Sequence, residues 1–265
     1  MPLFKKRKFA LALGGGAARG IANIGVLKVL EQERIPIDLI VGSSIGALIG
    51  AAYSLGVPTY KMEKAALKFA WDKLADFSIS RMSILKGEKL ANIVEEFTDN
   101  KGFSDARIPI AVTAADIETG EELTYTKGNL QKLIQASCSW PGFFPPVVIE
   151  GRKLVDGGIL NSIPVKMAKH LGATKIIAID IGFCAKKGTI DNLFQMFMQS
   201  IQLLGTELDR YQSMQADVII KPKLLNLDQF AFHRAREAIR DGEEAAKNVI
   251  PEIRKKLQLD VGLWK

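Results

Sequence analysis

The sequence predicts an α/β fold with three layers, α/β/α, in which a mostly parallel sheet is covered by helices on both faces. Two observations predict it. Short apolar runs alternate along the chain with longer segments of helical periodicity, and several of these runs end at glycine turns that lead directly into a helix. The composition agrees, because 265 residues with 48% hydrophobic and 25% charged side chains are typical of a folded globular protein. Disordered, collagen-like and disulfide-stapled chains are excluded.

The first elements follow from local pattern. Residues 9–13 are an apolar run that ends at Gly14, which predicts a buried strand closed by a glycine turn. From Ile21 to Leu30, large apolar side chains recur at three-residue spacing, which predicts a helix. Residues 39–41 predict a second buried strand, and the apolar stretch after it predicts a helix over 47–55.

The remaining elements are predicted by the same two signals, short apolar runs for strands and longer periodic segments for helices. The further predicted strands are residues 108–114, 122–126, 147–149, 153–155, 176–181 and 218–220. The further predicted helices are residues 60–71, 89–97, 192–215 and 234–249.

The chain shows no internal repeat, low-complexity linker or break in composition. We therefore expect a basic N-terminal tail, residues 1–7, and a single catalytic domain, residues 8–265, with its core motifs within 8–181 and a C-terminal helical part over 226–265. The apolar run after the tail is shorter than the roughly 7–15 residues of a signal peptide, and no stretch reaches the ~18 apolar residues of a membrane span. We expect a cytoplasmic chain that can contact membranes peripherally.

Cysteine and charge content narrow the function classes. Cys138 and Cys184 cannot form a disulfide framework, and neither belongs to a C-x-x-C pair, so we expect no zinc site; a single disulfide between them stays open. The excess of 36 Lys+Arg over 29 Asp+Glu gives a net charge of +7, which favours anionic partners of any kind. No base-reading module is recognisable, so we expect no nucleic-acid partner.

The most informative motif is Gly42-Ser43-Ser44-Ile45-Gly46, a G-x-S-x-G sequence between a predicted strand and a predicted helix. That context is what a nucleophile elbow requires, because the glycines permit a sharp turn that presents the Ser44 hydroxyl at the end of the strand. The alternative is a turn of small residues in which Ser44 only caps the helix.

A glycine-rich loop precedes the elbow, Gly14-Gly15-Gly16-Ala17-Ala18-Arg19-Gly20, again between a strand and a helix. It matches neither a P-loop, which needs Lys followed by Ser or Thr, nor the G-x-G-x-x-G dinucleotide fingerprint. Backbone N–H groups in such a loop stabilise negative charge, so we expect an oxyanion hole beside the serine.

The third motif is Asp156-Gly157-Gly158, which follows the predicted strand 153–155. Alone it is typical of a turn. A serine nucleophile needs a base, however, and histidine is the usual one. The chain holds two histidines, His170 and His233, at what we predict are a helix C-terminus and a helix start, so a Ser-Asp-His triad stays open alongside a Ser-Asp pair.

The three motifs in this order resemble the patatin-like phospholipase family, acyl hydrolases that use a Ser-Asp dyad without histidine. Residues 136–146 also look like the loop before the aspartate in bacterial members. The resemblance covers about residues 8–181, with weaker similarity at 239–242. One departure is visible, because the Asp-Gly-Gly-Gly sequence of the family is Gly14-Gly15-Gly16-Ala17 here.

The resemblance implies that Ser44 attacks an ester carbonyl and that Asp156 accepts its proton. It implies that backbone N–H groups of Gly15, Gly16 and Ala17 hold the oxyanion, that Arg19 braces the loop, and that no cofactor or metal takes part. The supporting residues implied are Gly14, Arg19, Gly20, Gly42, Gly46, Gly157 and Gly158.

The resemblance implies a lipid or other acyl-ester substrate, as for a phospholipase A or lysophospholipase. Residues 192–204 are rich in Phe, Met and Leu, which is typical either of a core-facing helix or of a lid or interfacial helix. Lys5 to Lys8 form either a contact with anionic lipid or a solvated tail. A non-catalytic regulator that keeps the fold is the competing function class.

Overall fold

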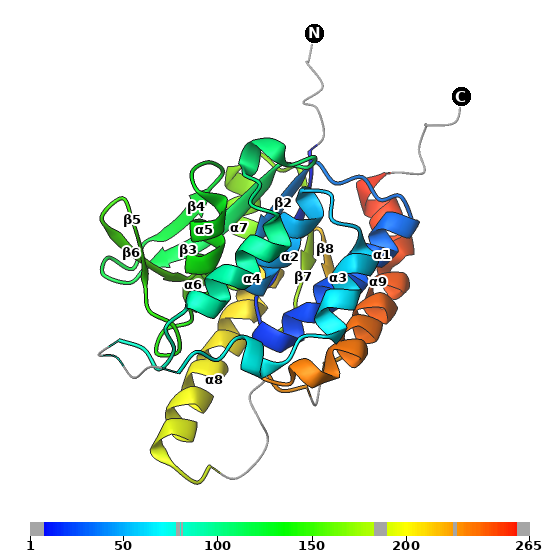
Figure 1. Ribbon diagram of the computed structural model, residues 1–265. Helices are drawn as coiled ribbons and strands as arrows, with labels where there is room; N and C mark the ends of the chain where they lie inside the picture. Colours follow the sequence, from blue (N-terminus) through cyan, green and yellow to red (C-terminus); the bar gives the residue numbers. More distant parts are fainter. Residues whose placement is uncertain (1–7, 78–79, 81, 183–189, 225–226, 259–265) are drawn as a thin grey trace.

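The computed structural model describes residues 8–77, 80, 82–182, 190–224 and 227–258. Its centre is an eight-stranded mixed sheet in which the strands follow one another in the order β5-β6-β3-β2-β1-β7-β8, while β4 pairs with β3 outside this path (Figure 1). The strands are β1 (Phe9–Leu13), β2 (Leu39–Gly42), β3 (Ile110–Asp116), β4 (Glu122–Tyr125), β5 (Val147–Ile149), β6 (Arg152–Asp156), β7 (Lys175–Ile179) and β8 (Val218–Ile220).

The middle of the sheet is parallel and one side of it is antiparallel. β3, β2, β1, β7 and β8 run in one direction, whereas β4, β5 and β6 add antiparallel pairings at the side of β3. The predicted α/β fold with a mostly parallel sheet is therefore confirmed. The parallel strands have their carboxyl ends on the same edge, and that is the edge where open α/β sheets bind ligands.

Helices cover both faces of the sheet, with most of them on one face. The helices are α1 (Ala22–Gln32), α2 (Ile45–Ser54), α3 (Thr59–Leu67), α4 (Glu88–Thr98), α5 (Leu130–Ser137), α6 (Gly158–Asn161), α7 (Val165–His170), α8 (Leu193–Ser213) and α9 (Ala235–Leu257). In β1 the side chains alternate between faces: Leu11 and Leu13 join the large core under α1, α2, α4, α5 and α9, while Ala10 and Ala12 join a smaller core under α7.

Several helices differ from the sequence prediction. The helix predicted over 60–71 ends at Leu67, and the short helix α6 was not predicted. The helix predicted over 234–249 continues to Leu257 through Pro251, because Ile253 and Leu257 are buried in the large core and this packing outweighs the hydrogen bond that proline removes. The helix α5 was not predicted. It is short, and it begins where the Asn129 side chain accepts a hydrogen bond from the Lys132 N–H.

Strand register brings two of the sequence motifs to the same level of the sheet. Gly42 at the end of β2 pairs with Val112 of β3, and two residues further along β3, Ala114 pairs with Asp156 at the end of β6. Ser44, two residues after Gly42, is therefore level with Asp156. The strand predicted over 153–155 extends to Asp156 in the structure, so the sheet holds the backbone of this residue.

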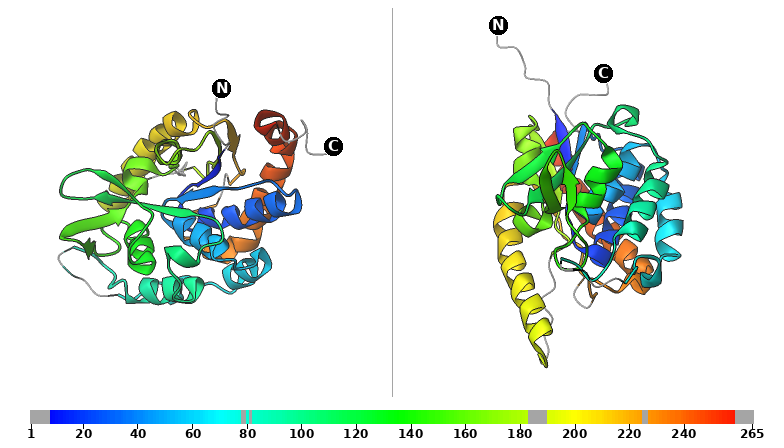
Figure 2. Two further views of the ribbon diagram at one scale, coloured as in Figure 1. Left: turned by 90° about the horizontal axis from the view of Figure 1, so that it is seen from above. Right: turned by 60° about the vertical axis from the view of Figure 1, so that its left-hand side comes forward.

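The long helix α8 projects beyond the carboxyl edge of the sheet. Its first half extends away from the body of the molecule, whereas its second half lies alongside α6 and α7 (Figures 1 and 2). Among the described helices, none combines the length and hydropathy needed to cross a bilayer.

Candidate active site

Ser44 occupies a sharp turn between β2 and α2. Its backbone has φ 54° and ψ −131°, and such a positive φ is strained for a residue with a side chain. Ser44 is the residue before the first turn of α2, yet its hydroxyl makes no capping hydrogen bond to that helix. The backbone N–H of Ser44 instead donates to Ser137 Oγ at 2.8 Å. The interpretation of Ser44 as a helix cap is therefore wrong. The turn instead places Ser44 in the wall of a cavity.

The Ser44 hydroxyl donates to the carboxylate of Asp156. The distance from Ser44 Oγ to Asp156 Oδ2 is 2.6 Å, within the range of a strong O–H···O⁻ hydrogen bond. The other carboxylate oxygen, Oδ1, accepts the Gly158 N–H at 2.7 Å, and the Asp156 N–H donates to the Ser139 carbonyl at 3.0 Å. Three directed hydrogen bonds thus fix the orientation of Asp156 toward Ser44.

Burial changes the acidity of Asp156. The side chain is 8% exposed, and no cationic side chain of the described residues pairs with it, so desolvation disfavours its charged form. This burial raises the pKa of Asp156 to about 6, against the opposing effect of the hydrogen bonds from Ser44 and Gly158. A carboxylate with such a pKa is a stronger base than an exposed aspartate and is still ionised at neutral pH.

The glycine-rich loop lies directly against the elbow. A Cβ on Gly15 would lie 3.0 Å from Ser44 Cβ, and the Gly15 N–H donates to the Ser162 carbonyl at 3.0 Å. Gly16 has a φ of 147° and Ala17 a φ of 47°. Among the described residues, the N–H groups of Gly16, Ala17 and Ile45 meet no hydrogen-bond acceptor, and all three residues line the same cavity as Ser44. Gly15 was expected to donate to the oxyanion, but its N–H group already donates to the Ser162 carbonyl.

The other glycines of the three motifs stand where the backbone approaches its neighbours closely. A Cβ would come within 3.0 Å of another heavy atom at each of these positions, so a larger residue would displace a neighbouring backbone or side-chain group. The glycines concerned are Gly14, Gly20, Gly42, Gly46, Gly157 and Gly158.

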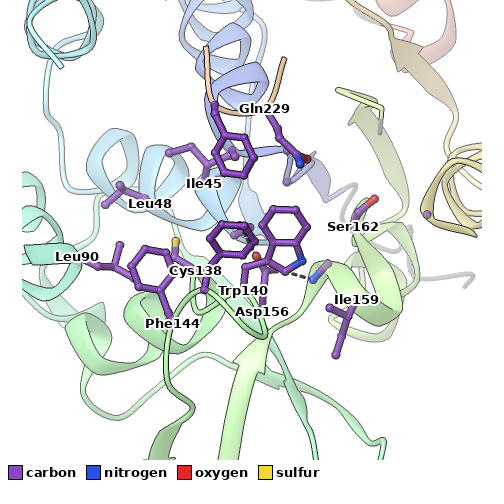
Figure 3. A pocket seen from close by; sticks show the side chains of 18 of the residues that line it. Ile45, Leu48, Leu90, Cys138, Trp140, Phe144, Asp156, Ile159, Ser162 and Gln229 are labelled. Atoms are coloured by element: carbon purple, nitrogen blue, oxygen red, sulfur yellow. Dashed lines mark hydrogen bonds between the residues drawn. The ribbon is translucent and has the colours of Figure 1, made fainter. Parts of the chain in front are cut away.

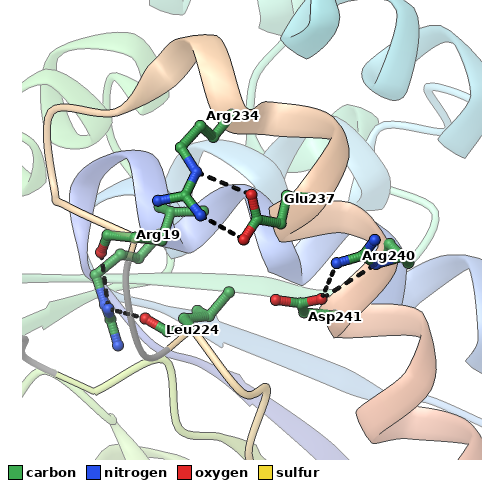
Figure 4. A network of polar contacts seen from close by, with 7 residues as sticks. Arg19, Leu224, Arg234, Glu237, Arg240 and Asp241 are labelled. Atoms are coloured by element: carbon green, nitrogen blue, oxygen red, sulfur yellow. Dashed lines mark hydrogen bonds and ion pairs between the residues drawn. The ribbon is translucent and has the colours of Figure 1, made fainter.

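The Arg19 side chain connects the glycine-rich loop to distant segments of the chain. Its guanidinium is buried and donates to carbonyl groups of Ile181, Gly182, Leu224 and Leu227, at distances between 2.7 and 3.0 Å. Figure 4 shows the bond to Leu224, with the ion pairs of α9 nearby. The planar fork of arginine suits this arrangement, because several donors point in fixed directions at once. The loop is thereby tied to the chain that follows β7 and β8.

Ser44 and Asp156 lie in a cavity of about 690 Å³ whose walls are almost entirely apolar. Figure 3 shows Asp156 beside Trp140, with Ile45, Leu48 and Phe144 among the surrounding side chains. Trp140 stacks on Phe143 with ring centroids 5.1 Å apart, and Phe230 packs against both rings. This volume and lining are typical of a site that binds an apolar ligand around a few polar groups.

The two histidines lie elsewhere. His170 is the last residue of α7 and His233 lies in the short 3₁₀ turn before α9; both are exposed, and neither lines the cavity. Cys138 does line it, and burial raises the pKa of its thiol well above the ordinary value. Cys184 and residues 1–7 lie outside the described residues. Lys8 donates to the Leu171 carbonyl at 2.9 Å, so it is anchored at the end of α7.

Three buried serines support the site and were not predicted. Ser137 receives the Ser44 N–H, the Ser139 carbonyl receives the Asp156 N–H, and the Ser162 carbonyl receives the Gly15 N–H. Ser137 and Ser139 belong to the segment 136–146 singled out by resemblance, which was the only available signal for them. Within the described residues, no cluster of three or more His, Cys, Asp or Glu side chains could hold a metal ion.

Comparisons with known proteins identify the family of this chain. The family model described as patatin-like phospholipase matches residues 11–169. The lysophospholipase nte1 of Aspergillus oryzae is 32% identical over 249 residues, which cover 91% of this chain and 16% of that protein. The human patatin-like phospholipase domain-containing protein 6 is 33% identical over 181 residues, which cover 65% of this chain and 13% of that protein. The chain thus spans a small part of the length of these eukaryotic relatives.

Solved structures share the fold at low sequence identity. The crystal structure of VipD from Legionella pneumophila superposes with a TM-score of 0.65 and 12% identity, over 93% of this chain and 67% of that one. The crystal structure of the type III effector protein ExoU gives a TM-score of 0.51 and 11% identity, over 94% of this chain and 53% of that one. The family model covers more than half of the residues and includes all three motifs, so this chain belongs to the patatin-like phospholipase family.

Proposed function

We propose that this chain is a serine hydrolase of lipid acyl esters, of the phospholipase A or lysophospholipase type, and that Ser44 and Asp156 are its catalytic dyad. The observation that carries the proposal is the 2.6 Å hydrogen bond from Ser44 Oγ to a buried Asp156 carboxylate inside a large apolar cavity. The cavity suits an acyl chain, and the two polar groups suit the attack on its ester bond.

In the proposed reaction Ser44 Oγ attacks the ester carbonyl carbon while Asp156 Oδ2 takes the hydroxyl proton. The carbonyl oxygen becomes an oxyanion, for which the N–H groups of Gly16, Ala17 and Ile45 are the available donors. Collapse breaks the ester bond, and the leaving alcohol takes the proton from Asp156. Water then attacks the acyl-serine and gives its proton to Asp156. The bond from the acyl carbon to Ser44 Oγ breaks, Asp156 returns the proton to Ser44 Oγ, and the fatty acid is released.

A direct test uses the wild-type protein. We expect a fluorophosphonate probe to label it, with the adduct on Ser44 by peptide mass spectrometry, and we expect fatty acid release from phospholipid or lysophospholipid. Comparing these two lipids, and esters at either glycerol position, assigns the substrate. A protein that neither reacts with the probe nor releases fatty acid from any of these lipids would instead be a non-catalytic member of the family.

The histidines are expected to be dispensable. Because His170 and His233 are exposed and lie outside the cavity lining, the double variant His170→Ala/His233→Ala should keep kcat/KM within about twofold of wild type. Hydrolysis of a soluble ester measures this. A loss of two or more orders of magnitude in this variant would replace the dyad with a Ser-Asp-His triad.

The pH dependence of the rate should follow Asp156. The base form of this carboxylate is populated above its pKa of about 6, so kcat/KM should rise with pH, tenfold per unit, up to that value and level off above it. Initial rates with an uncharged soluble ester from pH 4.5 to 8 give the profile. A rate already at its plateau at pH 4.5 would contradict a buried aspartate base.

A further inference from the structure

The outer half of α8 is an uncharged helix that projects from the protein. Between Asp191 and Glu207 the sequence contains no Asp, Glu, Lys or Arg. The inner half is attached to the body: Asp209 accepts a hydrogen bond from Ser162 Oγ, and Gln212 Nε2 donates to the Leu160 carbonyl at 2.9 Å. Figures 1 and 2 show that the outer half extends past the carboxyl edge of the sheet, where no other helix or strand of the described residues lies beside it.

Large apolar side chains on α8 are unusually exposed. Leu193 is 82% exposed, Phe197 62% and Leu204 68%, with further exposed apolar residues along the same helix and at its C-cap. These are Met196, Leu203, Leu208, Tyr211 and Met214. Contiguous exposed apolar surface of this kind marks a place of contact with a membrane, a ligand or another protein.

One stripe of α8 connects the cavity to this exposed end. Residues three or four positions apart share a helix face. By that spacing Leu193, Phe197 and Leu204 lie on the same face as Leu208 and Tyr211. Leu204, Leu208 and Tyr211 line the cavity that contains Ser44, whereas Leu193 and Phe197 lie beyond it. The apolar wall of the cavity therefore continues outward along α8.

We infer that the outer half of α8 docks on a phospholipid membrane by inserting the apolar stripe that begins at Leu193 and Phe197. This inference rests on the proposed function, because a lipid with long acyl chains is held in a bilayer and must pass from it into the cavity. A helix satisfies its own backbone hydrogen bonds, so it can enter the interfacial region of the bilayer. The continuous apolar wall then leads an acyl chain from the membrane to Ser44.

The apolar, uncharged composition of the stripe determines which lipids the helix should bind. Since the outer half of α8 carries no charged side chain, its insertion depends on apolar burial and not on lipid charge. Binding should therefore occur on neutral phosphatidylcholine vesicles and persist in high salt. Docking through the positive net charge or the N-terminal lysines would require anionic lipid and would weaken as salt screens it.

The test compares wild type with Leu193→Ser/Phe197→Ser, two exposed positions outside the cavity lining. The matched control is Tyr60→Ser/Val148→Ser, which removes side chains that are 64% and 62% exposed on α3 and β5. In sedimentation with phosphatidylcholine vesicles at about 0.5 M salt, we expect the first variant to lose at least about tenfold in partitioning and the control to bind like wild type. Turnover of a soluble short-chain ester should be unchanged in both, while hydrolysis of vesicle phospholipid should fall only in the first.

Three results would overturn the inference. The first is wild-type partitioning of Leu193→Ser/Phe197→Ser. The second is binding that needs anionic lipid and disappears in high salt, which would assign docking to basic residues. The third is a dimer that the two substitutions convert to a monomer without any change on vesicles, which would make α8 a contact between copies. If partitioning falls as expected but wild type hydrolyses no ester, the docking inference stands and the proposed function fails.

Discussion

Ser44→Ala is expected to abolish ester hydrolysis, with a fall in kcat/KM of at least about 10⁴-fold. The reason is that Ser44 carries the hydroxyl that donates to Asp156. In other serine hydrolases, removal of the catalytic serine leaves only the residual rate supplied by binding and the oxyanion site. Alanine keeps the backbone turn but provides no atom that can form the acyl-enzyme. Fatty acid release and fluorophosphonate labelling, measured on protein of unchanged thermal stability, check the result.

Ser43→Ala is the matched control for this variant. Ser43 is the neighbouring residue in the same turn, it is fully buried, and its hydroxyl has no hydrogen-bond partner in the described part of the chain. Its removal should leave turnover within about twofold and stability unchanged or slightly higher, because an unsatisfied buried hydroxyl costs free energy. Activity that survives Ser44→Ala, or that depends equally on Ser43, would contradict the assignment of the nucleophile.

Ser44 and Asp156 could be singled out from sequence because each follows a recognisable strand. A short apolar run that ends in G-x-S-x-G or Asp-Gly-Gly is a local signal, and parallel topology brings strand ends to a common edge. The antiparallel placement of β6 was not predicted, since a pairing between β3 and β6 depends on residues about 40 positions apart in the chain. The 2.6 Å contact between the two side chains follows from that pairing.

The oxyanion donors could be only partly predicted. Which N–H groups of the glycine-rich loop remain available depends on Ser162, whose carbonyl accepts the Gly15 N–H. No local pattern around Gly15 reveals a partner so far away in sequence. The structure shifts the expectation from Gly15, Gly16 and Ala17 to Gly16 and Ala17, and it adds Ile45, the residue after the proposed nucleophile.

The sequence also left open whether residues 192–204 form a core helix or an exposed one. Periodicity alone cannot distinguish them, because a stripe that packs in a core and a stripe that faces a ligand have the same spacing. In the structure both occur along one helix. Leu204, Leu208 and Tyr211 of α8 line the cavity, whereas Leu193 and Phe197, nearer the start of the helix, are exposed outside it. The aromatic wall formed by Trp140, Phe143 and Phe230 could not be predicted from local sequence patterns either, because it joins segments that are distant in sequence.

Asp156→Asn is expected to lower kcat/KM by about 10³-fold or more while leaving the fold intact. Asparagine has the same shape, and its Oδ1 can still accept the Gly158 N–H. Its amide nitrogen then faces Ser44 as a donor, so the hydrogen bond reverses and the Ser44 proton has no acceptor. Steady-state rates with a soluble ester measure the loss. Turnover close to the wild-type rate would show that Asp156 is not the base.

The same variant should become more stable than wild type as pH rises. Burial raises the pKa of Asp156 from 3.8 in the unfolded chain to about 6. The folded protein therefore favours the neutral carboxyl group. The stability that wild type has with this group neutral is fully present below pH 3.8 and is lost as pH rises through 6. Asparagine does not titrate. The difference in unfolding free energy between variant and wild type should therefore grow by about 3 kcal/mol from pH 3.5 to pH 7. Urea unfolding across that range measures it, and a constant difference would mean that Asp156 is not held in a desolvated site. Lost turnover combined with gained stability is the pattern of a catalytic group, because a residue placed for structure would lose both.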